Sequence, residues 1–210
     1  MENRDRRNRK ITSKRKNQLQ AAEPPKNNGD QLPEKEIKFI LRGSDYIIGR
    51  AGRTMLAKIL KGSRDKKLLA ISQELELHNN EAYGSLSQYT LAQITDKIDW
   101  MIRHGYLKLE YEWKMPVILF TDKGWEIERE ELAKDFLDEW DRWIDNRLPV
   151  VSMSYLKDLN RGLVTLFLDK VMQTNDPKYL PLLRKWEPID YKKVRAMIRR
   201  VIQHLESCKK

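Results

Sequence analysis

Apolar residues recur at helical spacing in three successive stretches of the first half of the chain. The stretches that place apolar side chains on one helical face are residues 36–41, 53–61 and about 90–104. In the third stretch the side expected to be buried consists of Leu91, Ile94, Ile98, Met101 and Ile102. Each stretch therefore predicts an amphipathic helix.

After the third stretch the spacing of apolar residues becomes alternating. Leu107, Leu109 and Tyr111 are interleaved with charged residues, which predicts a strand. A tight turn is expected at residues 113–116, and a second strand over 117–121. The two strands together predict a β-hairpin.

Glycines mark the ends of two of these helices. Gly62 and Gly105 stand where a left-handed C-terminal cap belongs. Gly124 ends the hairpin before a further helix begins. Three helices followed by a hairpin are the order of a winged-helix domain, a relative of the helix-turn-helix, which we expect over residues 34–130.

The remaining residues, 131–210, predict a helical region. Residues 131–144 continue a helix whose apolar stripe consists of Phe136, Trp140, Trp143 and Ile144. A second helix is expected over 155–172, and residues 176–205 are typical of one HEAT-like helical pair. The fold class is therefore mainly α with a β-hairpin wing: a winged helix-turn-helix followed by a HEAT-like helical region.

Residues 1–33 lack periodic apolar positions and are strongly basic. They hold 9 Lys/Arg against 4 Asp/Glu, and they include a Pro-Pro pair at 24–25. Such a segment buries too little apolar surface to offset its ordering entropy, so we expect a disordered basic arm. An arm of this kind adds salt-sensitive affinity for nucleic acid without sequence choice.

The net charge of +10 points to a polyanionic partner, because it is unevenly placed. Residues 42–67, inside a folding segment, hold eight basic residues and only two acidic ones. No apolar stretch is long enough to predict a membrane span. The single cysteine, Cys208, excludes a disulfide framework and a cysteine-ligated zinc site. We expect a cytoplasmic protein, with association with the nucleoid compatible with its charge.

Four motifs in order resemble the RQC domain, the winged helix C-terminal to the motor of RecQ-family DNA helicases. They are GRTMLAKILKGS at 52–63, Tyr83-Gly84, IDWMIRHGYL at 98–107 and FTDKG at 120–124. The resemblance covers roughly residues 36–130.

The resemblance implies a phosphate-binding loop at Lys61-Gly62-Ser63-Arg64. A glycine permits close backbone approach, and a hydroxyl with two cations offers donors to phosphate. The cations that reinforce this loop are Arg50, Arg53 and Lys66. The alternative is an ordinary helix C-cap with solvated neighbours, which also requires Gly62.

The resemblance also implies that the hairpin acts as a wedge at a duplex end. Trp113 stands at the expected tip and would stack on the terminal base pair, followed by Met115. Lys108 and Lys114 would contact the sugar–phosphate backbone. The alternative is that Trp113 folds back and packs as part of the core.

The sequence departs from the helicases in lacking their catalytic and metal-binding signatures. It has no G-x-x-x-x-G-K-[ST] phosphate loop and none of the four zinc-binding cysteines that precede RQC there. His78, His104 and His204 have no metal-ligand spacing. We therefore expect a stand-alone RQC-type protein that is not an enzyme and needs no cofactor and no metal.

Two functions fit these observations. The first is a non-catalytic protein that recognises DNA structure, such as a duplex end, fork or junction, in DNA repair or replication. A separate helicase or repair protein is then an expected partner. The alternative is a protein-interaction adaptor, or a factor that binds structured RNA or the ribosome, using the same winged helix and helical tail.

Overall fold

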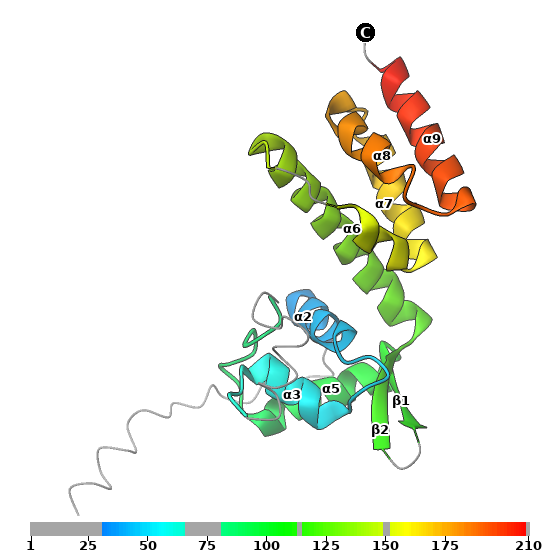
Figure 1. Ribbon diagram of the computed structural model, residues 1–210. Helices are drawn as coiled ribbons and strands as arrows, with labels where there is room; N and C mark the ends of the chain where they lie inside the picture. The colour runs from blue at the N-terminus through cyan, green and yellow to red at the C-terminus, as the bar shows by residue number, and fades with distance from the viewer. Residues whose placement is uncertain (1–30, 66–80, 113–114, 149–151, 209–210) are drawn as a thin grey trace, which may run out of the picture. The chain divides into compact units, whose positions relative to one another are not determined.

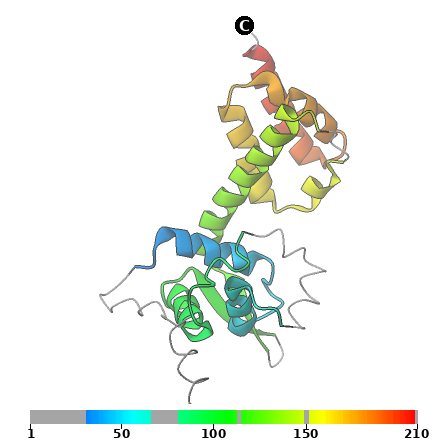
Figure 2. The same ribbon diagram turned by 90° about the vertical axis from the view of Figure 1, so that its left-hand side faces the viewer.

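The computed structural model describes residues 31–65, 81–112, 115–148 and 152–208. The contacts divide the chain into two compact units, the first ending at Gly124 and the second beginning at Trp125. The predicted arm at 1–33 lies almost entirely outside the described residues. Each unit is a separate body with its own core (Figures 1 and 2).

The first unit contains the three predicted helices in the predicted order. They are α2 (Glu34–Asp45), α3 (Arg53–Lys61) and α5 (Leu91–Arg103). In Figure 1, α2 lies across α3 and α5. The side chains that fill the space between them are fully buried: Ile40, Leu41, Leu56, Ile59, Leu60, Ile94, Ile98 and Met101.

Local sequence sets both ends of α5. The Thr90 side chain accepts from the backbone N–H of Gln93, and the Gln93 side chain accepts from the Thr90 N–H, which forms a capping box. Gly105 follows the helix with φ +71°, as its position predicted. Leu91 was expected on the buried side, but it is 44% exposed because it opens the helix on its outer side.

A buried ion pair joins α5 to α2. Lys97 Nζ lies 2.6 Å from Glu36 Oε2, with only 7% and 12% of the two side chains exposed. The Tyr89 hydroxyl donates to the other oxygen of Glu36 at 2.8 Å, and Lys97 Nζ lies 4.3 Å from the centre of the Tyr89 ring. Both charges therefore have partners, as burial requires.

The hairpin consists of β1 (Leu107–Glu112) and β2 (Met115–Phe120), paired antiparallel. Its register sets Leu107 opposite Phe120 and Glu112 opposite Met115. The predicted second strand began too late, because Met115 and Pro116 belong to β2 and not to the turn. Proline lacks a backbone N–H, and it is tolerated here because it stands near the start of a strand.

Thr121 fixes the exit from the hairpin. Its hydroxyl donates to the Gly105 and Tyr106 carbonyls at 2.6 and 3.0 Å and accepts from the Gly124 N–H at 3.2 Å. A side chain at Gly124 would place its Cβ 2.0 Å from the Tyr106 carbonyl oxygen. Only glycine fits this close approach, where α6 (Asp122–Asp145) begins.

The second unit is helical throughout its described residues. After α6 it contains the 3-10 turn η2 (Ser154–Asp158), α7 (Arg161–Gln173), the 3-10 turn η3 (Pro177–Tyr179), α8 (Leu180–Trp186) and α9 (Lys192–Ser207). The single helix predicted over 155–172 was wrong, because the chain breaks at Asn160. The Asn160 side chain accepts from the Gly162 N–H at 2.8 Å and caps α7.

Aromatic residues fill the core of the second unit. The rings of Trp140 and Phe167 meet edge to face with their centroids 4.8 Å apart, and Trp140 meets Trp186 in the same way at 6.0 Å. On α9 the five residues predicted to be buried are buried: Val194, Ile198, Val201, Ile202 and Leu205. The tryptophans at 140 and 186 are therefore core residues. A HEAT-like identity for α8 and α9 stays a prediction.

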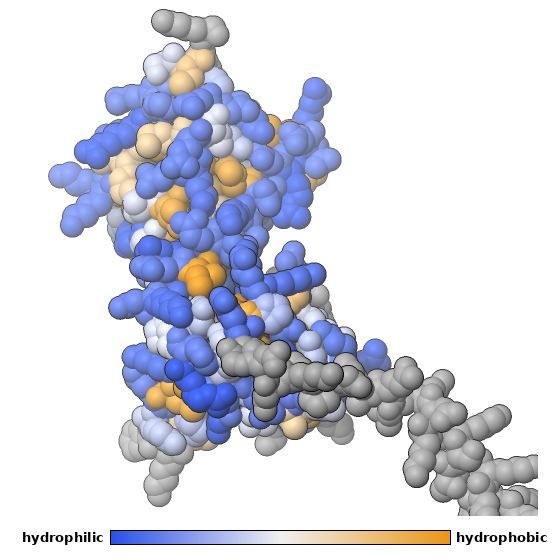
Figure 3. Space-filling view, turned by 180° about the vertical axis from the view of Figure 1, so that it is seen from behind, coloured by the Kyte–Doolittle hydropathy of each residue, from blue (hydrophilic) through white to orange (hydrophobic). Residues whose placement is uncertain are grey.

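One face of the protein is drawn with its hydropathy in Figure 3. The face drawn in Figure 3 is largely hydrophilic, with hydrophobic residues in small separate patches. Among the described residues, no helix combines the length and the apolar character needed to cross a membrane.

Candidate nucleic-acid interface

The start of α3 is joined to the hairpin by the backbone. Gly49 N–H donates to the Ile118 carbonyl at 3.0 Å, and Ile118 N–H donates to the Ala51 carbonyl at 2.9 Å. A Cβ at Gly52 would lie 2.6 Å from the Pro116 carbonyl oxygen, so the segment before α3 and β2 are in close contact here. Residues 49–51 therefore run alongside β2 and carry Arg50, which is exposed, to the hairpin.

The N-terminus of α3 is electropositive. Gly52 provides no side-chain cap, and the first turn holds no acidic residue. The unpaired N–H groups and the positive end of the helix dipole favour an anion here. Arg53 opens the helix and pairs with Asp99 of α5 at 2.5 Å, yet 44% of its side chain stays exposed. Arg53 therefore keeps donors for a ligand while Asp99 fixes its position.

The C-terminus of α3 is a Schellman motif. Gly62 has φ +71°, its N–H donates to the Ile59 carbonyl, and the Ser63 N–H donates to the Lys58 carbonyl at 2.9 Å. The Ser63 carbonyl accepts from the Tyr83 hydroxyl at 2.9 Å. Gly62 thus has the helix-ending geometry of the alternative interpretation. A phosphate contact at this loop stays a prediction.

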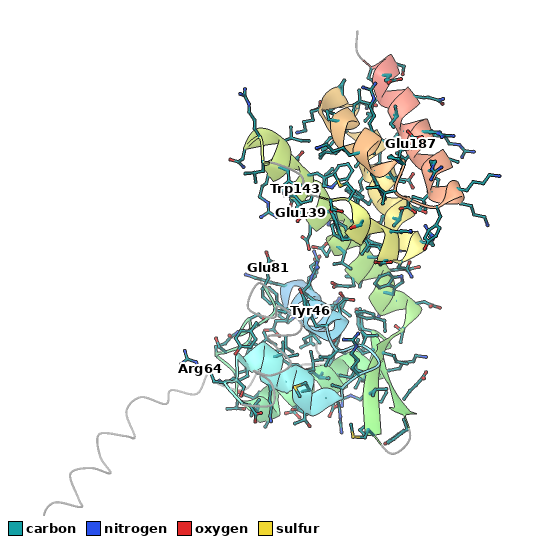
Figure 4. The ribbon with its side chains drawn as sticks, in the orientation of Figure 1. Tyr46, Arg64, Glu81, Glu139, Trp143 and Glu187 are labelled. Carbon is teal, nitrogen blue, oxygen red and sulfur yellow. The ribbon has the colours of Figure 1, made fainter. Side chains whose placement is uncertain are left out.

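Lys61 has a structural role that its sequence position did not reveal. Its ammonium donates to the carbonyls of Ser87 and Tyr89 at 2.6 and 2.7 Å. These bonds tie the end of α3 to the segment that precedes α5. Arg64, by contrast, is exposed and has no recorded ion pair among the described residues, and it extends away from the helices in Figure 4.

The described part of the hairpin exposes apolar side chains near its turn. Tyr111 is 75% exposed and Met115 is 64% exposed. Tyr111 stands opposite Pro116, the residue that approaches Gly52. Tyr111 was missed as a candidate, because alternation alone assigned it to the buried face. Its place beside the turn was the available signal.

The other hairpin candidates divide between described and undescribed residues. Lys108 lies on β1 and pairs with Glu110 at 2.5 Å. Trp113, Lys114 and Lys66 lie outside the described residues, and so does the predicted contact of the indole with a terminal base pair.

The structure separates the residues predicted to contact phosphate along α3 into two groups. Arg50 and Arg53 lie at the start of α3, beside the hairpin, and Ser63 and Arg64 follow its end. A nine-residue helix spans about 13 Å, so these are two contacts and not one cluster. The arrangement suits a ligand with negative charges repeated at that scale. In the described part of the chain, no group of three His, Cys, Asp or Glu residues could hold a metal ion.

Comparison with known proteins addresses the first unit. Residues 34–135 match the family model of the RQC domain. The chain is 29% identical over 99 residues to "ATP-dependent DNA helicase RecQ" of Bacillus subtilis (strain 168), a match that covers 47% of this chain and 16% of that helicase. No solved structure matches.

The matched region begins at α2 and runs past the end of the first unit, to residue 135 within α6. It contains α2, α3, α5 and the hairpin, and the domain suggests DNA binding, since it occurs in RecQ helicases. Residues 34–135 of this chain therefore resemble an RQC domain in sequence and in fold.

Proposed function

We propose that this protein binds DNA and recognises its structure, at a duplex end, fork or junction, through α3 and the hairpin. The observation that carries the proposal is the uncapped, basic start of α3, hydrogen-bonded through residues 49–51 to β2. It sets a phosphate-binding helix terminus beside a projecting hairpin. Phosphate contacts position a protein on a duplex without reading its sequence.

The two ends of α3 fit the spacing of a duplex. They lie about 13 Å apart, and the major groove of B-DNA is about 12 Å wide. Arg50 at one end and Arg64 at the other can therefore contact phosphates on opposite sides of a groove. Both side chains are exposed, and neither has a recorded ion pair in the part of the chain that the structure describes.

The hairpin supplies the preference for an open end. Tyr111 and Met115 expose apolar surface next to the two residues of the turn. A base stacked on an aromatic ring gains about 1–3 kcal/mol, which is comparable with the cost of unstacking one base step. The hairpin can therefore hold a frayed end, but it cannot drive unwinding.

A titration with four ligands tests the proposal. Fluorescence anisotropy would compare a blunt duplex, a forked duplex, a single strand and an RNA hairpin over a range of salt concentrations. Arg50→Ala with Arg64→Ala should reduce the slope of log K against log salt by about 2 on duplex DNA. The matched control is Lys35→Ala with Arg103→Ala, which removes the same charge from exposed positions on α2 and α5.

A second pair of variants tests the hairpin. Tyr111→Ala with Met115→Ala should weaken binding to the forked and blunt duplexes and leave binding to the single strand unchanged. If the protein binds the RNA hairpin more tightly than either duplex, its ligand is structured RNA and not DNA. Absence of nucleic-acid binding by the unmodified protein, or equal slopes for the Arg50/Arg64 and control variants, would overturn the proposal in favour of an adaptor.

A further inference from the structure

The exposed side of α9 is basic and lies outside the RQC domain. The helix holds five Lys/Arg residues and no acidic residue before Glu206. Its opposite side is buried in the core of the second unit. We call the exposed residues Lys192, Lys193, Arg199 and Arg200 the α9 basic face.

Most of the charge on this face is not neutralised. Arg199 pairs with Glu187 at 2.6 Å, and Figure 4 shows Glu187 beside α9. No ion pair is recorded for Lys192, Lys193 or Arg200 across the described ranges. Arg195 does not belong to the face, because its guanidinium donates to the carbonyls of residues 187, 188 and 190 at 3.0–3.3 Å.

An exposed tyrosine with two cations extends the face at its N-terminal end. Tyr191 is 53% exposed. Lys157 Nζ lies 4.6 Å and Arg161 Cζ 5.0 Å from the centre of its ring. The exposed acid beside them in sequence is Asp158, which follows Lys157 in η2. Two cations therefore lie at the ring, and the acids near them are Asp158 and the buried Asp190.

A buried carboxylate holds this end of the face in place. Asp190 is 2% exposed, and it accepts from Trp186 Nε1 at 2.9 Å and from the Tyr191 N–H at 2.7 Å. Arg161 Nη1 lies 3.3 Å from the same carboxylate. The positions of Tyr191 and Arg161 are thus set by the core. Arg161 is therefore held beside the ring by a buried partner before any ligand binds.

We propose that the α9 basic face is a second contact for the sugar–phosphate backbone of nucleic acid, separate from the RQC domain. This inference rests on the proposed function. Lys193 and Arg200 are seven residues apart, about 10 Å along the helix axis, so the face presents a row of cations and not a point. Such a row with an aromatic residue at its end suits a polymer of phosphates and bases.

The test measures the salt dependence of binding by the full chain to one long duplex. Lys193→Ala with Arg200→Ala should lower the slope of log K against log salt by about 2. The matched control is Lys134→Ala with Arg142→Ala, which removes equal charge from exposed positions on α6. Because all four side chains are exposed, thermal unfolding should be nearly unchanged, and this measurement verifies that each variant is folded.

Two outcomes would overturn the inference while leaving the proposed function intact. One is an equal slope of log K against log salt for the α9 and α6 variants. The Arg50→Ala/Arg64→Ala variant would in that case still show a reduced slope. The other comes from a competition experiment with poly-L-glutamate at a concentration of charge equal to that of the duplex. If this competitor removes the contribution of the α9 basic face to duplex binding, the face is a surface for acidic polypeptides. If the unmodified protein binds no nucleic acid, the proposed function fails first.

Discussion

The two units of this chain are stabilised by different kinds of core. The first buries aliphatic side chains between α2, α3 and α5, whereas the second interlocks Trp140, Phe167, Tyr179 and Trp186. An aromatic side chain buries 150–250 Å² of surface in proteins generally. Four aromatic residues therefore supply a large share of the buried surface in the second unit, beside aliphatic side chains, whereas aliphatic side chains supply it between the three helices of the first.

The units also differ in how they bury charge. The first contains a complete ion pair, Lys97 with Glu36, between two helices. The second contains two buried carboxylates, Glu128 and Asp190, and Asp190 is satisfied mainly by N–H donors from its own loop and helix. A buried pair is sensitive to the loss of either partner. A carboxylate held by several donors tolerates the loss of one of them better.

The largest expected effect is in the aromatic core. Trp186→Ala should lower the free energy of unfolding of the second unit by about 3–5 kcal/mol, through cavity formation and loss of the donor to Asp190. Hydrogen exchange would show faster exchange in α7 and α9, with α3 and α5 unchanged. Trp143→Ala, at a partly buried position, is the control and should cost less. Equal losses for the two variants would contradict an interlocked core.

The buried ion pair should rank next. Lys97→Met leaves the Glu36 carboxylate buried with only the Tyr89 hydroxyl, and should cost the first unit about 3 kcal/mol in urea unfolding. Combining it with Glu36→Leu should restore much of that loss, because no charge remains buried. A double variant as unstable as the single one would show that packing, not charge, explains the loss.

A smaller effect is expected at the exit from the hairpin. Gly124→Ala would force its Cβ against the Tyr106 carbonyl and should cost about 1–3 kcal/mol in thermal unfolding. Gly105→Ala is the matched control: it has φ +71° but nothing within 4 Å of the added Cβ. Left-handed strain alone should cost about 1 kcal/mol. If Gly105→Ala destabilises the protein more than Gly124→Ala, the left-handed backbone angle matters more than the close contact with the Tyr106 carbonyl.

The smallest effect concerns pH. Burial raises the pKa of Asp45, at the C-terminal end of α2, although Arg42 opposes the shift. Because the folded protein then binds this proton more tightly than the unfolded chain, its free energy of unfolding falls as the pH rises from about 4 through the raised pKa. Asp45→Asn should therefore stabilise the first unit at pH 7 by about 0.3–1 kcal/mol, and have little effect at pH 4.

A parallel variant in the second unit sharpens the pH comparison. Burial also raises the pKa of Glu139, while the hydroxyl of Tyr155 donates to its carboxylate at 3.3 Å and lowers it. Glu139→Gln should also raise the free energy of unfolding at pH 7, but by less than Asp45→Asn does, because the glutamine loses the charge-assisted bond from Tyr155. Urea unfolding at pH 4 and pH 7 measures both. If the free energy of unfolding rises as much at pH 4 as at pH 7, ionisation of the buried carboxylate is not the cause of the effect.

Sequence patterns predicted the elements of the first unit closely, because two of its helices end at glycines and the spacing of its apolar residues changes clearly from helical to alternating. The predicted helix over 53–61 is α3, and Gly62 and Gly105 both have positive φ. The break at Asn160 was missed, because apolar spacing continues across it while the asparagine side chain caps the next helix. A local polar bond decided that boundary, and periodicity does not report such bonds.

The candidate interface was only partly predictable. Charge density located Arg50 and Arg53, but not their connection to the hairpin, which runs through backbone bonds to Ile118 that leave no side-chain signal. The same holds for Lys61, whose partners are carbonyls of Ser87 and Tyr89. Main-chain partners depend on the tertiary fold, so residue types alone do not identify them.

The backbone bonds between residues 49–51 and Ile118 also bear on self-association. They occupy the outer edge of β2 at Ile118, which disfavours pairing there with a strand from another molecule. That leaves the outer side of β1, where Lys108 and Glu110 put charge on a short strand. Short, charged border strands resist edge-to-edge aggregation. Both edges of the hairpin thus carry a feature that acts against pairing with a second molecule.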